Sequence, residues 1–158
     1  MSSWQRVEEQ APELAAAVRR RFVAHPHLTM ATLRRDGSPR ISGTEVVFQG
    51  ADLWVAGMPG SRKLADLRRD GRVAVHSGTD DPPGWTGDGK VAGRAVEVAE
   101  GRERDDVARA LGQEPPGGFE LFRIDVQEVV HVFLGEPADH LVIESWHEGR
   151  GVERVERR

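Results

Sequence analysis

The first part of the chain has the apolar spacing of an amphipathic helix. Apolar residues recur at intervals of four from Leu14 to Phe22, and Pro12 suits a first-turn position after a short break. The dipeptide His25-Pro26 ends this pattern, because the residue before a proline is disfavoured in helical conformation. We therefore expect an N-terminal helix over about residues 3–24.

From residue 27 the apolar spacing changes from four to two, which is typical of β-strands. Asp36-Gly37 is a strong hairpin signal, and Gln49-Gly50 marks a second turn. The strands that we expect are 27–34, 39–48, 53–57, 72–77, 90–98, 121–126, 128–134 and 140–146. Short helices are expected over 61–69 and 104–111, with loops over 78–89 and at the Pro-Pro-Gly-Gly stretch 115–118.

Many short, mostly hairpin-linked strands with a few short helices predict a mainly β, antiparallel barrel. The 158 residues show no internal repeat or long linker, so we expect a single domain over 1–158, with the barrel at 27–146. The tail, 147–158, is expected to be a frayed terminus. The alternative is that one of its arginines (Arg150, Arg154, Arg157 or Arg158) reaches an acidic ligand.

Composition narrows the possible functions. The net charge of −4 argues against nucleic-acid binding, which needs a basic face. There is no cysteine, which excludes disulfides and thiolate chemistry. No apolar run is long enough to span a membrane and the first residues are not a secretory signal, so we expect a cytoplasmic protein.

One short motif, Gly60-Ser61-Arg62-Lys63, stands where a strand ends and a helix begins. Ser61 is a natural N-cap, with free backbone N–H groups and the positive end of the helix dipole behind it. Followed by a guanidinium and an ammonium, it forms a cradle suited to a phosphate. The alternative is that Ser61 only caps the helix while Arg62 and Lys63 are solvated.

A phosphate alone does not account for tight binding at this motif. Two charge-assisted hydrogen bonds and a dipole contribution give on the order of 4–7 kcal/mol, whereas micromolar binding needs about 8. A large flat group lying on the neighbouring strands must therefore contribute the remainder.

The segments PGSRKLADLRRDGRVAV and DGKVAGRAVEV, in this order after a hairpin, resemble the pyridoxamine 5′-phosphate oxidase-like, FMN-binding split-barrel superfamily. The resemblance covers about residues 25–135 and implies a split β-barrel of Greek-key type. It further implies a homodimer with both sites at the subunit interface. The cofactor-binding residues that it implies are Arg40, Ile41, Ser42, Gly43, Ala56, Gly57, Met58, Ser61, Arg62 and Lys63.

Several positions depart from the authentic oxidase. Glu45 stands where the oxidase has a second phosphate-binding lysine, Ala56-Gly57 replaces a Tyr-Thr pair, and Asp88 replaces a glutamine. The C-terminal Arg-Leu-x-Pro substrate motif is missing from the tail, which ends at Arg158. Pyridoxamine phosphate oxidation is therefore not implied, and the chain looks more like the small actinobacterial branch that binds FMN or the deazaflavin coenzyme F-420.

The function that we infer from the sequence is a flavin- or deazaflavin-dependent oxidoreductase acting on a small organic substrate. The cofactor supplies the hydride chemistry, so no separate catalytic residue is assigned. The alternative is a non-catalytic module that binds flavin, haem or another tetrapyrrole. Trp85 either covers the flavin ring or anchors its own loop, and the six histidines show no metal-binding spacing.

Overall fold

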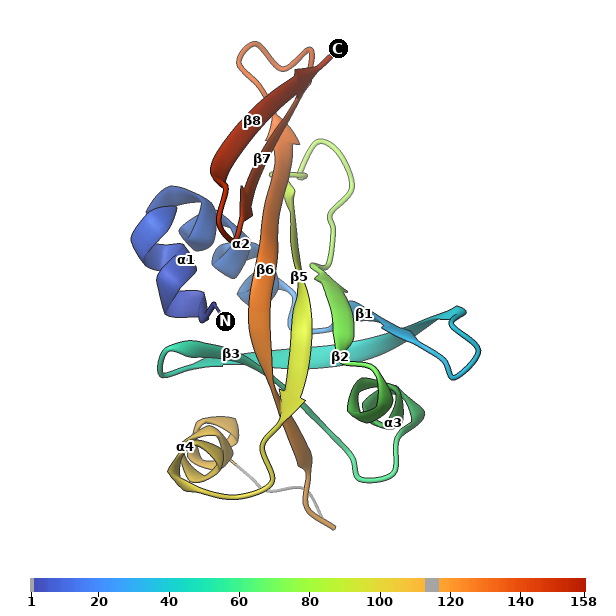
Figure 1. Ribbon diagram of the computed structural model, residues 1–158. Coiled ribbons are helices and arrows are strands. Elements are labelled where there is room, and N and C mark those ends of the chain that lie inside the picture. Colours follow the sequence, from blue (N-terminus) through green and yellow to red (C-terminus); the bar gives the residue numbers. More distant parts are fainter. Residues whose placement is uncertain (1, 113–116) are drawn as a thin grey trace.

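The computed structural model describes residues 2–112 and 117–158, and one eight-stranded antiparallel sheet dominates it (Figure 1). The strands are β1 (Leu28–Leu33), β2 (Pro39–Gln49), β3 (Asp52–Gly57), β4 (Arg72–His76), β5 (Asp88–Glu97), β6 (Glu120–Leu134), β7 (Leu141–His147) and β8 (Gly151–Arg157). The helices are α1 (Trp4–Gln10), α2 (Pro12–Ala24), α3 (Arg62–Arg69) and α4 (Arg102–Leu111).

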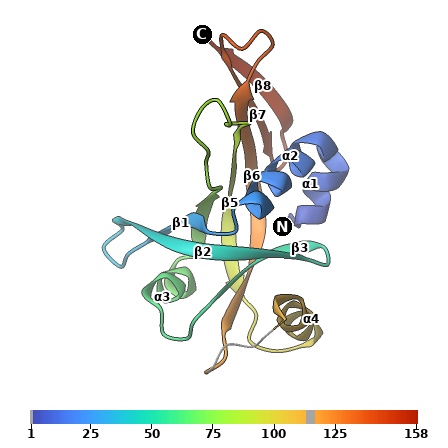
Figure 2. The same cartoon turned by 180° about the vertical axis from the view of Figure 1, so that it is seen from behind.

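Six of the strands close into a barrel. The sheet order is β3-β2-β1-β4-β5-β6-β7-β8, and β3 also pairs with β6. The chain makes three consecutive hairpin-linked strands and then returns so that β4 lies beside β1, which is the Greek-key order. The predicted antiparallel split barrel is confirmed. In Figure 2 the β7–β8 hairpin extends beyond the barrel, away from α3 and α4.

The expectation of two separate strands over 121–126 and 128–134 is wrong. Both belong to the single strand β6, and the interruption is a β-bulge opposite the Ala92–Gly93 step of β5. At the bulge Val126 pairs with Gly93 and Glu128 pairs with Ala92, so Gln127 has no partner on β5. After an extra residue, the side chains that face the core fall on residue numbers of the opposite parity, although the strand continues.

The expectation of a frayed C-terminal tail is also wrong. Residues 151–157 form β8, in which Leu141 pairs with Arg157 and His147 pairs with Gly151. The hairpin is possible because Gly149 and Gly151 adopt positive φ angles of 79° and 77°, which glycine reaches without steric strain.

The N-terminal segment forms two helices, where the sequence predicted one over 3–24. Ala11 separates them with a φ of −143°, and Pro12 begins α2 because it has no N–H with which to continue α1. The Ser3 hydroxyl caps α1 by accepting a hydrogen bond from the Arg6 backbone N–H at 3.2 Å. No helix within the described parts of the chain is long and apolar enough to cross a membrane.

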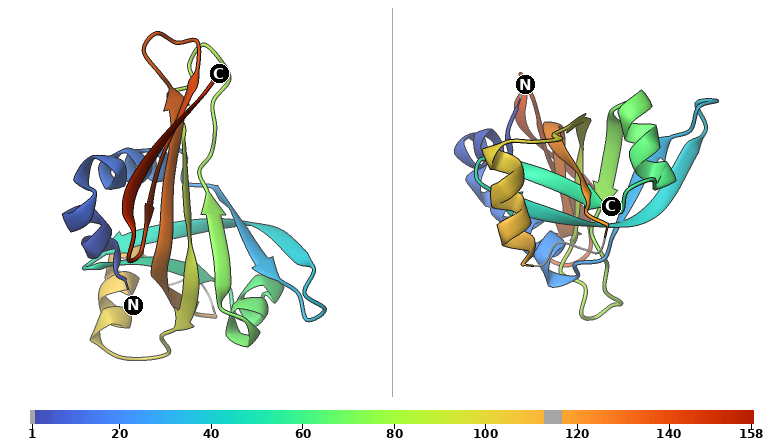
Figure 3. Two further views of the ribbon diagram at one scale, coloured as in Figure 1. Left: turned by 45° about the horizontal axis from the view of Figure 1, so that its top comes forward. Right: turned by 90° about the horizontal axis from the view of Figure 1, so that it is seen from below.

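The main core fills the barrel and the space between the barrel and the N-terminal helices. It contains Trp4, Val18 and Phe22 from the helices together with Met30, Val55 and other barrel residues. Helix α3 contributes Leu64 and Leu67 to this core. A smaller cluster lies under α4. Seen from below, α3 and α4 lie on opposite sides of the barrel end (Figure 3).

Candidate functional site

Helix α3 connects β3 to β4 and presents its first residues beside β2. Leu64 is fully buried, and it packs so closely on Gly57 that a Cβ at residue 57 would lie 2.9 Å from the Leu64 Cδ1. This close approach fixes the start of the helix against the end of β3. It explains why glycine occupies position 57.

Ser61 occupies the N-cap position of α3, as the sequence predicts, but its hydroxyl does not cap the helix. The Ser61 Oγ is buried and has no hydrogen-bond partner among the described residues. A buried hydroxyl without a partner costs about 1–3 kcal/mol. The first turn of α3 therefore offers an unused hydroxyl together with the free backbone N–H groups of a helix N-terminus.

Lys63 is the residue that joins the helix start to β2. Its Nζ donates a hydrogen bond to the Gly43 carbonyl oxygen at 2.7 Å. Burial lowers the pKa of Lys63, and the nearby Glu45 carboxylate opposes this by favouring the ammonium form. Arg62 is exposed. Ser61, Arg62, Lys63 and Gly43 are thus brought together at one corner, which we call the α3 corner.

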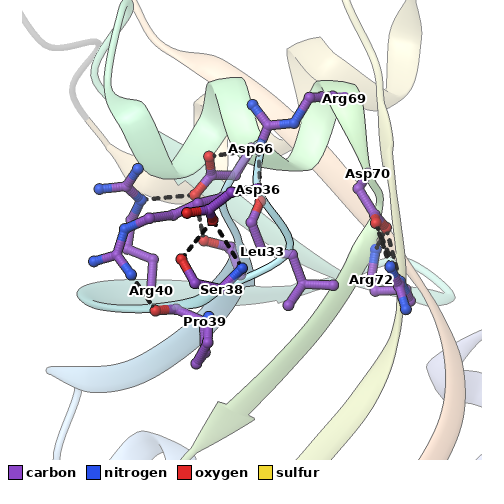
Figure 4. Close-up of polar contacts among 11 residues, drawn as sticks. Leu33, Asp36, Ser38, Pro39, Arg40, Asp66, Arg69, Asp70 and Arg72 are labelled. Carbon is purple, nitrogen blue, oxygen red and sulfur yellow. Dashed lines mark hydrogen bonds and ion pairs between the residues drawn. The ribbon is translucent and has the colours of Figure 1, made fainter.

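Arg40, in contrast, is directed to another partner. Its Nε donates to the Asp66 Oδ2 at 2.7 Å, and Asp66 also accepts from the Arg69 Nη2 at 2.9 Å and the Thr32 Oγ1 at 2.8 Å (Figure 4). Burial alone would raise the pKa of Asp66, but these three hydrogen bonds outweigh it and lower the pKa to about 2. Sequence reasoning did not identify Asp66 as the partner of Arg40.

The other strand residues separate into two faces. Ile41 and Gly43 are exposed, whereas Arg40 and Ser42, which alternate with them along β2, are partly buried, as the pleat requires. Met58 follows β3 and is 71% exposed, and Ile41 is 75% exposed. Two large apolar side chains, one on β2 and one directly after β3, are thus open to solvent beside the α3 corner.

Ala56 lies on β3 opposite Glu45 and packs against the cluster under α4. The Glu45 carboxylate is 3.5 Å from the Nδ1 of His27. Glu45 also lies close enough to Lys63 to favour its ammonium form, so its carboxylate reduces the positive charge at the α3 corner.

The last turn of α3 is held from the opposite side. Arg68 donates to Glu97 on β5 at 2.7 and 2.8 Å and to Glu120 on β6 at 2.8 Å. These hydrogen bonds raise the pKa of Arg68 and lower that of Glu97. Glu120 also accepts from the Gly60 backbone N–H at 3.3 Å, so the same acidic residue steadies both ends of the helix.

Trp85 is anchored within its own loop. Its Nε1 donates to the Asp88 carboxylate at 3.1 Å. The loop before β5 and helix α3 lie at opposite ends of β5 (Figures 1 and 2), so Trp85 does not cover the α3 corner of its own chain. Within the described residues, no three histidine or acidic side chains gather as metal ligands would.

A second basic feature lies beside the α3 corner. A hollow between the β1–β2 turn and α3 is lined by Arg34, Arg35, Asp36, Arg40, Asp66 and Arg69. Sequence reasoning did not identify this hollow, because the two contributing segments are about thirty residues apart in the chain.

Comparison with known proteins gives one family match. The family model described as pyridoxamine 5′-phosphate oxidase matches residues 14–133. None of the curated proteins matches the chain.

Solved structures share the fold at low sequence identity. PhzG from Burkholderia lata, solved with tetrahydrophenazine-1-carboxylic acid, superposes with a TM-score of 0.63 at 15% identity, over 96% of each chain. A pyridoxamine 5′-phosphate oxidase-related, FMN-binding protein from Nostoc punctiforme gives 0.62 at 16%, over 94% of this chain and 96% of that one. HutZ, the heme storage protein from Vibrio cholerae, gives 0.55 at 18%, over 75% and 90%.

Proposed function

The chain belongs to the pyridoxamine 5′-phosphate oxidase family, and from this premise we propose that it is an FMN-dependent oxidoreductase that transfers hydride between the cofactor and a small organic substrate. The observation that carries the proposal is the unpartnered Ser61 hydroxyl at the start of α3, two residues before the lysine that binds the Gly43 carbonyl oxygen. FMN, when bound, supplies the hydride chemistry, and the protein supplies binding and orientation.

The residues at the α3 corner fit a phosphate group. The Ser61 hydroxyl, the first backbone N–H groups of α3 and the Lys63 ammonium are all donors, and each suits an anionic oxygen. Arg62 is exposed and adds a guanidinium with five N–H donors. Arg40 acts here as a positioning residue, because its ion pair with Asp66 fixes β2 against α3.

The neighbouring strands fit an aromatic ring system. Ile41 and Met58 expose apolar surface, and no atom lies within 4 Å of the position of a Cβ at Gly43. A flat ring is able to approach the backbone of β2 at a glycine more closely than at any residue with a side chain. Covering these apolar groups would supply the binding energy that the phosphate alone lacks.

Glu45 bears on which flavin is preferred. Its carboxylate lies close enough to Lys63 to affect the pKa of that lysine, so it also repels a ligand anion at the α3 corner. FMN carries a phosphate monoester, which is close to doubly charged at neutral pH, whereas the phosphodiester of deazaflavin F-420 carries one negative charge. Deazaflavin is therefore the alternative cofactor.

We propose that the active form is a homodimer. Across β6, β7 and β8, Val132 pairs with Ile143 and Ile143 with Val155, while Leu134 pairs with Leu141, so all five share one face. Val155, Leu134 and Leu141 are 48%, 46% and 38% exposed. A second copy of the chain covering this face would remove an apolar patch that a monomer leaves in water.

The binding proposal is tested by titrating FMN and deazaflavin F-420 while following their fluorescence. Lys63→Met should weaken binding at least tenfold, whereas the matched change at the other lysine, Lys90→Met, should alter it less than twofold. Ser61→Ala should weaken binding without lowering the melting temperature, because its hydroxyl has no protein partner to lose. Equal affinities for the Lys63 and Lys90 variants would reject the α3 corner as the cofactor site.

A non-catalytic carrier is the second candidate, and the observation in its favour is the shared fold with the heme storage protein HutZ. Oxidation of reduced FMN by an added acceptor, measured on the loaded protein under anaerobic mixing, distinguishes the two. An oxidoreductase turns over repeatedly, whereas a carrier reacts at most once per bound cofactor. Product formation from pyridoxamine phosphate would instead show the authentic oxidase reaction.

A further inference from the structure

The hollow between the β1–β2 turn and α3 has the composition of an anion site. Its walls are four arginines and two aspartates, and we call it the arginine pocket: Arg34, Arg35, Asp36, Arg40, Asp66 and Arg69. Four guanidiniums against two carboxylates leave two positive charges, in a chain whose net charge is −4. The pocket is therefore positively charged, although the chain as a whole is negatively charged.

The two carboxylates already have donors of their own. Asp66 accepts hydrogen bonds from Thr32, Arg40 and Arg69, and it is buried. Asp36 accepts from the Ser38 backbone N–H at 2.9 Å and the Ser38 hydroxyl at 2.6 Å, within its own turn (Figure 4). Neither carboxylate therefore needs the remaining guanidinium N–H groups.

Most guanidinium donors in the pocket are still available. Each arginine has five N–H donors. Arg40 uses Nε on Asp66, Arg69 uses Nη2 on Asp66 and the Leu33 carbonyl oxygen, and Arg34 uses Nη1 on the Pro39 carbonyl oxygen. Arg35 makes no hydrogen bond or ion pair with the residues that the structure describes.

The pocket is also preorganised. Asp66 holds Arg40 and Arg69 on either side of itself, and Arg69 is tied in addition to the Leu33 carbonyl oxygen at 2.6 Å. A guanidinium that is already fixed loses less freedom on binding than a solvated one. The planar fork of arginine matches the oxygens of a carboxylate or phosphate in pairs.

We propose that the arginine pocket binds a multiply charged oxyanion group of a small molecule, at a site separate from the α3 corner. Lys63 at the corner and Asp66 in the pocket are three residues apart on α3, so the two sites are neighbours on one rigid helix. Binding at the arginine pocket does not require that a flavin be bound at the α3 corner. Phosphate and carboxylate groups both offer paired anionic oxygens to a guanidinium, and the experiment distinguishes these two kinds of ligand.

The test is isothermal titration calorimetry of the flavin-free protein at low ionic strength with two probes, pyrophosphate and citrate. The double variant Arg34→Gln/Arg35→Gln removes two pocket arginines that do not hold Asp66. The matched control, Arg157→Gln/Arg158→Gln, removes the same charge from an adjacent arginine pair on the distant C-terminal hairpin. Circular dichroism melts show that the variants fold.

The pocket variant should bind the preferred probe at least tenfold more weakly than the parent, while the control stays within twofold. Preference for pyrophosphate identifies a phosphate-bearing ligand, and preference for citrate identifies a carboxylate-bearing one. Equal weakening in both variants would mean that net charge alone attracts the probes, and absence of saturable binding by the parent would mean that there is no site. Either result overturns the proposal. Probe binding at the α3 corner would leave the pocket variant as tight as the parent, because Ser61 and Lys63 are unchanged in it, and that result too overturns the proposal.

Discussion

Arg40 of β2 and Asp66 of α3 form an ion pair at the seam between the strand and the helix, with 2.7 Å between Nε and Oδ2. The Asp66 side chain is only 3% exposed and that of Arg40 is 20% exposed. The pair connects the barrel wall to the helix that begins the α3 corner, and it also forms one wall of the arginine pocket. Loss of this ion pair would therefore affect both the α3 corner and the arginine pocket.

Asp66→Asn should lower the free energy of unfolding by about 3 kcal/mol, because two guanidiniums at the seam lose their buried counter-charge. Urea denaturation followed by tryptophan fluorescence measures the loss. The control is Asp70→Asn, whose partner Arg72 is 61% exposed, and its effect should be much smaller. Similar losses for the two variants would show that burial of the Asp66 pair does not matter.

The same carboxylate should make stability depend on pH in the acidic range. The pKa of Asp66 is about 2 in the folded protein, below its ordinary value of 3.8, so the folded state binds this proton less readily than the unfolded state. Its stabilisation is fully present above about pH 4 and is lost as the pH falls through 2. As the pH falls from about 4 to 2, the free energy of unfolding should decrease more steeply for the parent than for Asp66→Asn. Parallel curves would contradict this assignment.

Gly93→Ala should be among the most damaging single changes in the barrel. A Cβ at residue 93 would lie 2.0 Å from the backbone oxygen of Asp125, at the bulge of β6, and backbone atoms cannot move aside as a side chain can. We expect a loss of about 3 kcal/mol or more in unfolding free energy. Gly43→Ala is the control, since nothing lies within 4 Å of its Cβ position, and it should leave thermal unfolding nearly unchanged.

Glu45→Gln should strengthen FMN binding. Removing a carboxylate near Lys63 relieves repulsion of roughly 1 kcal/mol, or about fivefold in Kd, and more for a dianion than for a monoanion. Fluorescence titrations of FMN and deazaflavin F-420 should therefore show a larger gain for FMN. If FMN affinity is unchanged, the phosphate does not lie near Glu45.

Val155→Glu should weaken the proposed homodimer, because it places a charge in the apolar face shared by β6, β7 and β8. Sedimentation equilibrium should show a dissociation constant at least tenfold higher than that of the parent. Val23→Glu is the matched control, since Val23 is 61% exposed on α2 rather than on this face, and it should leave the dimer intact. A parent that sediments as a monomer would reject the homodimer itself.

An interruption of a local pattern predicts structure less reliably than the pattern itself. The change of apolar parity near Gln127 is compatible with the end of a strand, but no turn residue stands there, and the structure contains a bulge instead. A basic tail interrupted by glycines predicts a frayed terminus, although the same glycines, Gly149 and Gly151, permit a hairpin. Pairing with β5, which is distant in sequence, keeps β6 continuous at the bulge, whereas the tail is held by pairing with its neighbour in the chain, β7.

By itself the sequence determined what depends on near neighbours: the strand and helix periods, the turns at Asp36-Gly37 and Gln49-Gly50, and the Ser61-Arg62-Lys63 motif at a helix start. Only the tertiary structure decided which distant groups meet. Closure of the barrel rests on pairing between β3 and β6, and Asp66 of α3 has Arg40 of β2 as its partner across the seam. Such choices depend on packing in three dimensions, because every arginine of the chain presents the same guanidinium, and only burial and distance select the one that an aspartate binds.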